Sequence, residues 1–178
     1  MALPRLERSA GWDVAKGENT FTDYRTSYQM NFRRGENPLV AEIEEKIAEY
    51  TNTPVVNGED MQVLMYRTGQ HYKTHWDYFD PRFPQNQQVL QRGGQRIMTF
   101  MVFLNEVDNG GETHFPRVPN EDKTDSLKIK PKTGRAIIWW NVNEQGNIDT
   151  DTLHEGLDPQ NGSIKFIITR WIREGVFI

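Results

Sequence analysis

From residue 61 onward the sequence is a series of short β-type segments separated by turn-rich stretches. Turn-forming residues such as Asp108-Asn-Gly-Gly and Lys132-Thr-Gly stand between the segments. A strand of this kind has an apolar side that must be buried, so a long series of them points to a β-sandwich or jelly roll. The segments predicted as strands are Met61–Tyr66, His71–Asp77, Arg96–Leu104, Leu127–Ile129, Arg135–Asn141 and Ser163–Arg173.

One helix is predicted ahead of these strands, over Pro38–Tyr50. Pro38 suits a first helical turn, and Leu39, Ile43, Ile47 and Tyr50 recur at the spacing of an apolar helical stripe. Residues 1–20 are polar and irregular, and residues 21–32 are mixed and extended. The sequence therefore predicts a mainly β fold, a sandwich or jelly roll with a supporting N-terminal helix.

Length and charge narrow the classes of protein to consider. The 178 residues favour a single domain, residues 1–178, and the formal net charge of -4 offers no reason to expect nucleic acid as a partner. No run approaches the roughly 18 apolar residues of a membrane helix, and the N-terminus lacks the apolar core of a signal peptide. The absence of cysteine excludes disulfides and thiolate chemistry and suits a reducing compartment such as the cytoplasm.

Two histidine pairings compete for a metal. His71 and His75 have the spacing of a zinc-binding helix, but the surrounding residues are strand-like, and in an extended chain the two would lie about 13 Å apart. His75 and Asp77 fit the extended chain better, because residues i and i+2 of a strand point the same way, about 6.6 Å apart. We therefore predict that His75 and Asp77 bind one ion.

A histidine, a carboxylate two residues later and a distant second histidine form the pattern that holds non-haem Fe(II) while leaving positions open. An isolated His-x-Asp is weak evidence, and it gains weight when a third ligand and a downstream cation are also present. We assign the third ligand to His154. Of the remaining histidines, His114 is predicted to be a hydrogen-bonded structural residue and His71 to be exposed.

A lysine interrupts the last apolar segment. Lys165 lies in Ile164-Lys-Phe-Ile-Ile-Thr-Arg-Trp, where an unpaired buried charge would be costly. Two interpretations stay open from the spacing alone: Lys165 lies on a solvated edge, or it pairs with the carboxylate of a bound organic acid. Arg170 of the same segment is predicted to be a surface cation.

These motifs, taken in order, resemble the prolyl 4-hydroxylase family. The resemblance begins with Tyr66-Arg-Thr-Gly-Gln-His-Tyr-Lys-Thr-His-Trp-Asp-Tyr-Phe, followed by Gly93-Gly-Gln-Arg-Ile-Met-Thr and Gly110-Gly-Glu-Thr-His-Phe-Pro. Pro131-Lys-Thr-Gly-Arg-Ala, His154 and Lys165-Phe-Ile-Ile-Thr-Arg-Trp close it. Upstream, Leu3-Pro-Arg-Leu-Glu-Arg-Ser, Tyr24-Arg-Thr-Ser and Asn57-Gly-Glu-Asp-Met-Gln-Val-Leu match the plant, algal, viral and bacterial branch, so the resemblance covers nearly the whole chain.

The resemblance implies a double-stranded β-helix and a catalytic set of His75, Asp77, His154 and Lys165. It implies Fe(II), 2-oxoglutarate and O2, with ascorbate as reductant, and hydroxylation of a prolyl C4–H in a proline-rich or collagen-like peptide with release of succinate and CO2. Matched positions suggest that Lys165, Tyr66 and Thr113 hold the far carboxylate of 2-oxoglutarate. The positions matching peptide-contacting residues of the family are Arg25, Ser27, Tyr72, Arg96 and Trp171.

The sequence departs from the family pattern in three places, and the last two concern fine substrate contacts. The family's usual strand and helix before Leu3 are missing, which leads us to expect either self-association or coverage of the exposed sheet by residues 1–20. The interval from His154 to Lys165 is one residue longer than expected, and Arg173 stands where some relatives have histidine.

Other functions remain open at this level. One is a 2-oxoglutarate oxygenase acting on another protein residue, a free amino acid or nucleic acid. Another is a jelly-roll binding module without catalysis, which the three iron ligands and Lys165 argue against, because binding alone needs no open-sided metal site. Trp139 and Trp140 are predicted to pack in the core.

Overall fold

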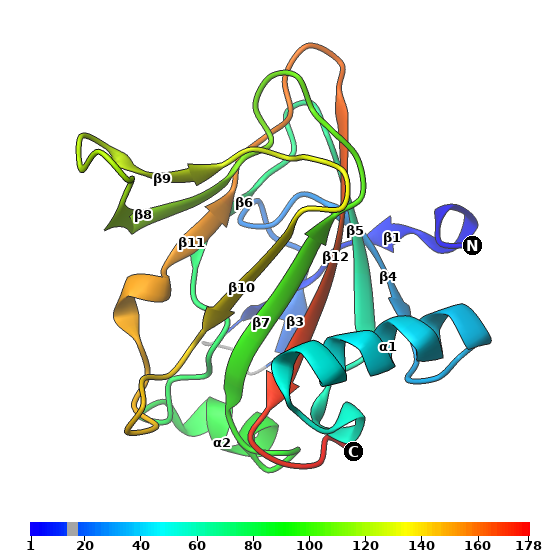
Figure 1. Ribbon diagram of the computed structural model, residues 1–178, viewed down its shortest axis with the longest axis vertical. Coiled ribbons are helices and arrows are strands. Elements are labelled where there is room, and N and C mark those ends of the chain that lie inside the picture. Colours follow the sequence, from blue (N-terminus) through cyan, green and yellow to red (C-terminus); the bar gives the residue numbers. More distant parts are fainter. Residues whose placement is uncertain (14–17) are drawn as a thin grey trace.

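The computed structural model describes residues 1–13 and 18–178 and shows two antiparallel sheets with α1 against the larger one (Figure 1). The six strands of the larger sheet lie in the order β1 (Glu7–Arg8), β4 (Tyr28–Phe32), β5 (Met61–Arg67), β12 (Ile164–Arg173), β7 (Arg96–Phe103) and β10 (Ala136–Trp140). The four strands of the smaller sheet lie in the order β6 (Tyr72–His75), β11 (His154–Gly156), β8 (Thr113–Pro119) and β9 (Ser126–Ile129). A separate pair is made by β2 (Gly11–Asp13) and β3 (Glu18–Thr20). The predicted mainly β, jelly-roll class is confirmed.

Each predicted strand has a counterpart, but several elements escaped prediction. Two of them belong to the smaller sheet: β8 carries Pro116 and Pro119, which argue against a strand, and β11 has only three residues. Helix α2 (Pro84–Leu90) was not predicted, because the residues just before it form a turn-rich stretch. The predicted strand at residues 71–77 was too long, because β6 ends at His75 and Asp77 lies in the bend that follows.

Helix α1 spans Pro38–Thr51, close to the predicted range, and its ends show why it stops where it does. The Asn37 side chain accepts a hydrogen bond from the Val40 amide at 3.1 Å, and Asn52 takes the left-handed conformation that closes the helix. Val40 and Ile47 are buried in two apolar clusters between α1 and the larger sheet. Ala2 and Leu6 pack against the first cluster, so residues near the N-terminus do cover part of this face.

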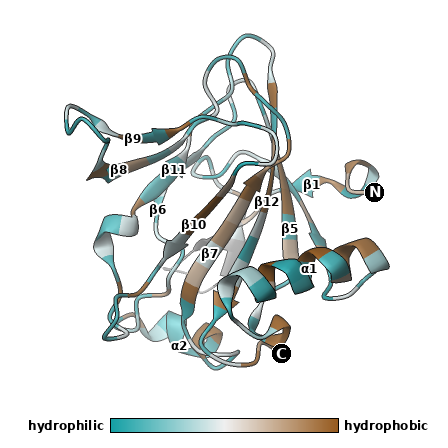
Figure 2. Ribbon diagram, in the orientation of Figure 1, coloured by the Kyte–Doolittle hydropathy of each residue, from teal (hydrophilic) through white to brown (hydrophobic). Residues whose placement is uncertain are grey.

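A third apolar cluster fills the space between the two sheets, and its members come from alternate positions of the same central strands. On β12, Ile167 belongs to this inner cluster, whereas Ile168 and Ile172 pack towards α1. Figure 2 shows the apolar residues concentrated on the central strands, with α1 alternating between apolar and polar faces. Side chains one residue apart on β12 therefore pack into two different layers.

No helix in the described part of the chain is long and apolar enough to cross a membrane.

The prediction of a surface position for Arg170 is wrong. Arg170 is 1% exposed, on the face of β12 that points to α1, and its Nη1 lies 2.9 Å from Oε1 of the equally buried Glu44. Its Nη2 donates to the carbonyl of Val55 at 2.9 Å, and Gly58 lies so close that a Cβ there would meet the guanidinium. The pair ties the helix to the sheet beneath it.

Arg170→Ala is expected to lower the free energy of unfolding by about 3–5 kcal/mol, because it leaves the Glu44 carboxylate buried without its charge partner. Urea unfolding followed by circular dichroism measures the change. Lys46→Ala removes an exposed partner of Glu42 and is expected to change stability little. Equal stability losses in the two variants would contradict the structural role of the buried pair.

Candidate metal centre and adjoining cavity

Three side chains far apart in the sequence converge at one end of the space between the sheets. His154 opens β11 and is paired with His75 of β6 in the antiparallel register, and Asp77 follows two residues after His75. His75 Nε2 lies 3.6 Å from Asp77 Oδ1, and His154 Nε2 lies 3.6 Å from Asp77 Oδ2. One ligand atom from each residue falls within 4.8 Å of the others, so a single ion could contact all three.

Both histidines are oriented by hydrogen bonds to the backbone. Nδ1 of His75 lies 2.8 Å from the carbonyl of Lys73, and Nδ1 of His154 lies 2.8 Å from the carbonyl of Thr152. A carbonyl only accepts, so each Nδ1 carries the proton and each Nε2 offers its lone pair to the centre of the group. This is the tautomer that a metal ligand needs.

The charges also suit a metal. Burial, reinforced by the neighbouring His154, lowers the pKa of His75 to about 3, so its ring is neutral at physiological pH. Burial alone would raise the pKa of Asp77, but His154, His75 and Arg96 together with a hydrogen bond from Thr99 hold it below its usual value. A neutral imidazole and an ionised carboxylate are the forms that bind metal, and a two-histidine, one-carboxylate set fits Fe(II).

The other two histidines lie outside this group. His71 Nε2 lies 3.1 Å from the Asp23 carbonyl, and the ring is partly buried instead of exposed as predicted. His114 bridges Glu155 at 2.6 Å and Ser126 at 2.7 Å, which joins three strands of the smaller sheet and agrees with the predicted structural role.

A cavity adjoins the triad, and Lys165 reaches into it from β12. Lys165 is 1% exposed, its Nζ lies 5.1 Å from the ring centroid of Tyr66, and no carboxylate of the described residues lies within ion-pair distance. Burial lowers the pKa of Lys165 to about 7, a shift that Glu112 opposes only in part. Of the two interpretations of this lysine, the solvated edge is wrong, because the side chain is buried in the wall of the cavity.

Tyr66 and Thr113 line the same cavity as Lys165. Burial raises the pKa of Tyr66, a shift that Arg25 and a side-chain hydrogen bond with Ser27 oppose only in part, so its hydroxyl stays protonated. The Thr113 hydroxyl contacts only the Met101 sulfur, at 3.9 Å, among the hydrogen bonds of the described residues. The structure therefore brings together three polar groups that the resemblance suggested for one carboxylate, within walls of Leu64, Met101 and Ile167.

Of the five positions suggested for peptide binding, three lie on this cavity. Arg25 lies 4.8 Å over the Tyr72 ring and donates to Gln62 at 2.6 Å, and Tyr72 stacks on His75. Trp171 forms part of the same wall. Ser27 does not: it is fully buried, and its hydroxyl donates to the Ser9 hydroxyl at 2.8 Å, so it has no access to a peptide.

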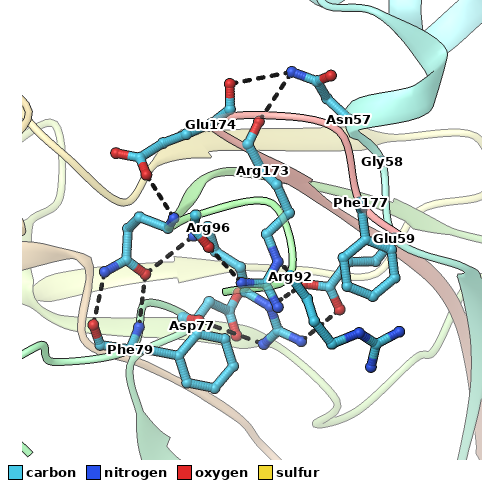
Figure 3. Close-up of polar contacts among 12 residues, drawn as sticks. Asn57, Gly58, Glu59, Asp77, Phe79, Arg92, Arg96, Arg173, Glu174 and Phe177 are labelled. Atoms are coloured by element: carbon cyan, nitrogen blue, oxygen red, sulfur yellow. Dashed lines mark hydrogen bonds and ion pairs between the residues drawn. The ribbon is translucent and has the colours of Figure 1, made fainter. Parts of the chain in front are cut away.

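Arg96, the fifth position, is not among the residues that line the cavity and belongs to a polar cluster with Glu59 and Arg173 (Figure 3). Its guanidinium donates to both carboxylate oxygens of Glu59, at 2.6 and 2.8 Å, and lies 3.9 Å over the Trp171 ring. Arg173 donates to the same Glu59 at 2.6 Å. Arg96 also donates from Nη1 to the Asp77 carbonyl at 3.4 Å, so most of its guanidinium is engaged by Glu59, Asp77 and Trp171. The sequence motif that contains Glu59 gives no sign of this role, because both arginine partners are distant in the chain.

The two adjacent tryptophans face opposite sides of β10, and only one of them is in the core. Trp139 lines the cavity, with its ring centroid 4.8 Å from that of His154. Trp140 is 54% exposed, so the prediction of core packing is wrong for it.

Comparisons with known proteins identify one superfamily of enzymes. Residues 61–173 match the profile of the 2OG-Fe(II) oxygenase superfamily. Probable prolyl 4-hydroxylase 10 and prolyl 4-hydroxylase 2 of Arabidopsis thaliana are 35% and 36% identical over 97% and 99% of this chain. The chain spans 62% of the length of each of these relatives.

Solved structures agree with the sequence matches. The viral collagen prolyl hydroxylase of Paramecium Bursaria Chlorella virus-1, solved as a 2OG complex, is 34% identical, with a TM-score of 0.67 over 84% of this chain and 80% of that one. A prolyl hydroxylase from Trichoplax adhaerens, solved with a peptide fragment of hypoxia inducible factor, shares the fold at 18% identity and a TM-score of 0.64, over 94% of this chain and 70% of that one.

Proposed function

Because this chain belongs to the prolyl 4-hydroxylase family of the 2OG-Fe(II) oxygenase superfamily, we propose that it hydroxylates prolyl residues of extended peptides. Fe(II) and 2-oxoglutarate serve as cofactor and co-substrate. The observation that carries the proposal is the pairing of an ordered two-histidine, one-carboxylate group with a buried lysine that lacks an acidic partner in the described chain. The two-histidine, one-carboxylate group suits a metal ion, and the buried lysine suits one carboxylate of a dicarboxylic acid.

In this proposal His75, Asp77 and His154 hold the iron through Nε2, a carboxylate oxygen and Nε2. When bound, the iron and 2-oxoglutarate supply the oxygen activation that no side chain can provide. The protein contributes position: backbone carbonyls orient both imidazoles, and burial keeps His75 neutral. The stack of Tyr72 on His75 restricts that ring further.

Lys165 receives the far carboxylate of 2-oxoglutarate, with Tyr66 and Thr113 as additional donors. A lysine is a compact cation suited to one carboxylate end, and the apolar walls exclude the water that would weaken the pair. The dicarboxylic acid is held by its far end, so its 2-oxo acid end is presented to the metal ligands.

Arg25, Tyr72 and Trp171 are proposed to contact the peptide. A polyproline II segment has no internal hydrogen bonds, so its carbonyls are free to accept from a guanidinium, and aromatic faces accept its rings. The peptide is already extended, which lowers the entropy lost on binding. Ser27 and Arg96 act behind this surface, by packing and by support of Trp171.

Incubation with Fe(II), 2-oxoglutarate and ascorbate is expected to add one oxygen atom to a proline-rich peptide and none to free L-proline. The panel contains a Pro-Ala-Pro-Lys peptide, a Pro-Pro-Gly repeat, matched peptides with alanine at every proline, and free proline, all read by mass spectrometry. Omission of 2-oxoglutarate is the control. Turnover of free proline with inert peptides would move the protein to the amino-acid hydroxylases, and oxidation of the alanine peptides would move it to another protein residue.

A further inference from the structure

The carboxylate of Asp77 is held by a buried chain of two side chains from neighbouring strands. Thr99 of β7 is fully buried, and its hydroxyl donates to Asp77 Oδ2 at 2.7 Å. Asn141, also fully buried at the end of β10, donates from Nδ2 to the Thr99 hydroxyl oxygen at 3.0 Å. Neither Thr99 nor Asn141 lines the cavity beside the metal ligands.

The direction of both hydrogen bonds follows from the chemistry of the groups. An ionised carboxylate only accepts, so Thr99 must donate its single hydroxyl proton to Asp77. The hydroxyl oxygen can then only accept from Asn141, which must present its NH2 group. This orientation leaves Asn141 Oδ1 buried without a hydrogen-bond partner among the described residues, an arrangement that costs free energy. The Asn141 amide is thus oriented by its hydrogen bond to Thr99, at the expense of a partner for its own Oδ1.

The backbone of Asn141 joins the chain to the second histidine. Its amide donates to the Ile97 carbonyl on β7 at 2.8 Å, and its carbonyl accepts from the Asp149 amide at 2.9 Å. Asp149 caps η3 (Thr150–Thr152), the turn that leads directly into His154. The same residue therefore anchors the carboxylate through Thr99 and the entry to His154 through its backbone.

We infer that Thr99 and Asn141 are positioning residues for the metal carboxylate. They prevent Asp77 from rotating, so that Oδ1 faces His75 while Oδ2, held by Thr99, faces His154. Partners of metal ligands that act in this way typically contribute about 10–100-fold to metal affinity. The inference rests on the proposed metal site, but it concerns residues that the proposed function does not itself require.

The test is anaerobic titration of the full chain with Co(II), followed by visible absorption and calorimetry, in a pair of substitutions that separate hydrogen bonding from packing. Thr99→Val keeps the shape and removes the hydroxyl, and it is expected to weaken Co(II) binding by about 10–100-fold. Thr99→Ser keeps the hydroxyl and loses a methyl group, and it is expected to retain most of the affinity. A role in packing alone predicts the reverse order, which would overturn the inference.

Asn141→Leu is expected to weaken Co(II) binding less than Thr99→Val, because Thr99 can still donate to Asp77. The double variant is expected to bind no more weakly than Thr99→Val alone, since the effect of Asn141 passes through the Thr99 hydroxyl. Fully additive losses would overturn the relay. Wild-type binding that is lost in Asp77→Asn establishes the metal site separately, so an unchanged Thr99→Val affinity in that setting overturns only the relay. A wild type that binds no Co(II) overturns the metal site and the relay with it.

Discussion

Asp77→Ala is expected to abolish high-affinity Fe(II) binding and the 2-oxoglutarate turnover that depends on it. The substitution removes the one anionic ligand and leaves two imidazoles that face an empty space. Loss of a group that merely orients a ligand already costs about 10–100-fold in metal affinity, so loss of the ligand itself is expected to exceed about 100-fold. Anaerobic iron titration and succinate release measure the two quantities independently.

The matched control is His71→Ala, because His71 is four residues from His75 in the sequence yet its ring contacts the Asp23 carbonyl and not the triad. This variant is expected to bind iron as the wild type does. Retention of tight binding in Asp77→Ala, or its loss in His71→Ala, would show that the metal lies elsewhere.

Lys165→Met is expected to weaken 2-oxoglutarate binding by about two to four decades while stabilising the ligand-free fold. Removal of one partner from a buried charge pair costs about 3–5 kcal/mol, which corresponds to that loss of affinity. In the ligand-free protein the lysine has no acidic partner among the described residues, so an apolar side chain of similar length relieves the cost of burying it. Calorimetry with the Mn(II)-loaded protein measures the affinity, and thermal unfolding measures the stability.

The pH dependence supplies a second test of Lys165. The pKa of Lys165 is about 7 in the unliganded fold, so at higher pH the neutral amine must take up a proton before it can pair with a carboxylate. The affinity for 2-oxoglutarate is then expected to fall by up to about tenfold per pH unit above about 7. Ligand-free stability changes in the opposite sense: the unfolded lysine binds its proton more tightly, so stability rises with pH from about 7 towards the ordinary lysine value. Lys165→Met is expected to lose both dependences, and their persistence would exclude Lys165 as the group that titrates.

The residues proposed as metal ligands could be identified from the sequence because two of them are close in the chain. Only one residue stands between His75 and Asp77, so their side chains stay close in almost any local conformation. His154 was assigned from the order of the family's motifs along the chain. Its pairing with His75 in the smaller sheet confirms that His75, Asp77 and His154 lie together. Helix α1 and strands β5, β7, β10 and β12 of the larger sheet could be predicted for a similar reason, since their apolar periodicity is a local property.

The sequence by itself therefore determined helix α1, the strands with clear apolar periodicity and the residues of the proposed triad. Tertiary structure alone decided what each face meets. Lys165 and Arg170 are five residues apart on β12 and so point to opposite layers; one reaches a cavity without an acid, and the other meets Glu44 beneath α1. Ser27 matches a groove position of the family but is buried and donates to Ser9. The hydrogen bonds of Thr99 to Asp77 and of Asn141 to Thr99 join residues 22 and 42 positions apart. Side-chain alternation follows from the geometry of a single strand, whereas burial and hydrogen-bond partners depend on which distant strand or helix packs against it.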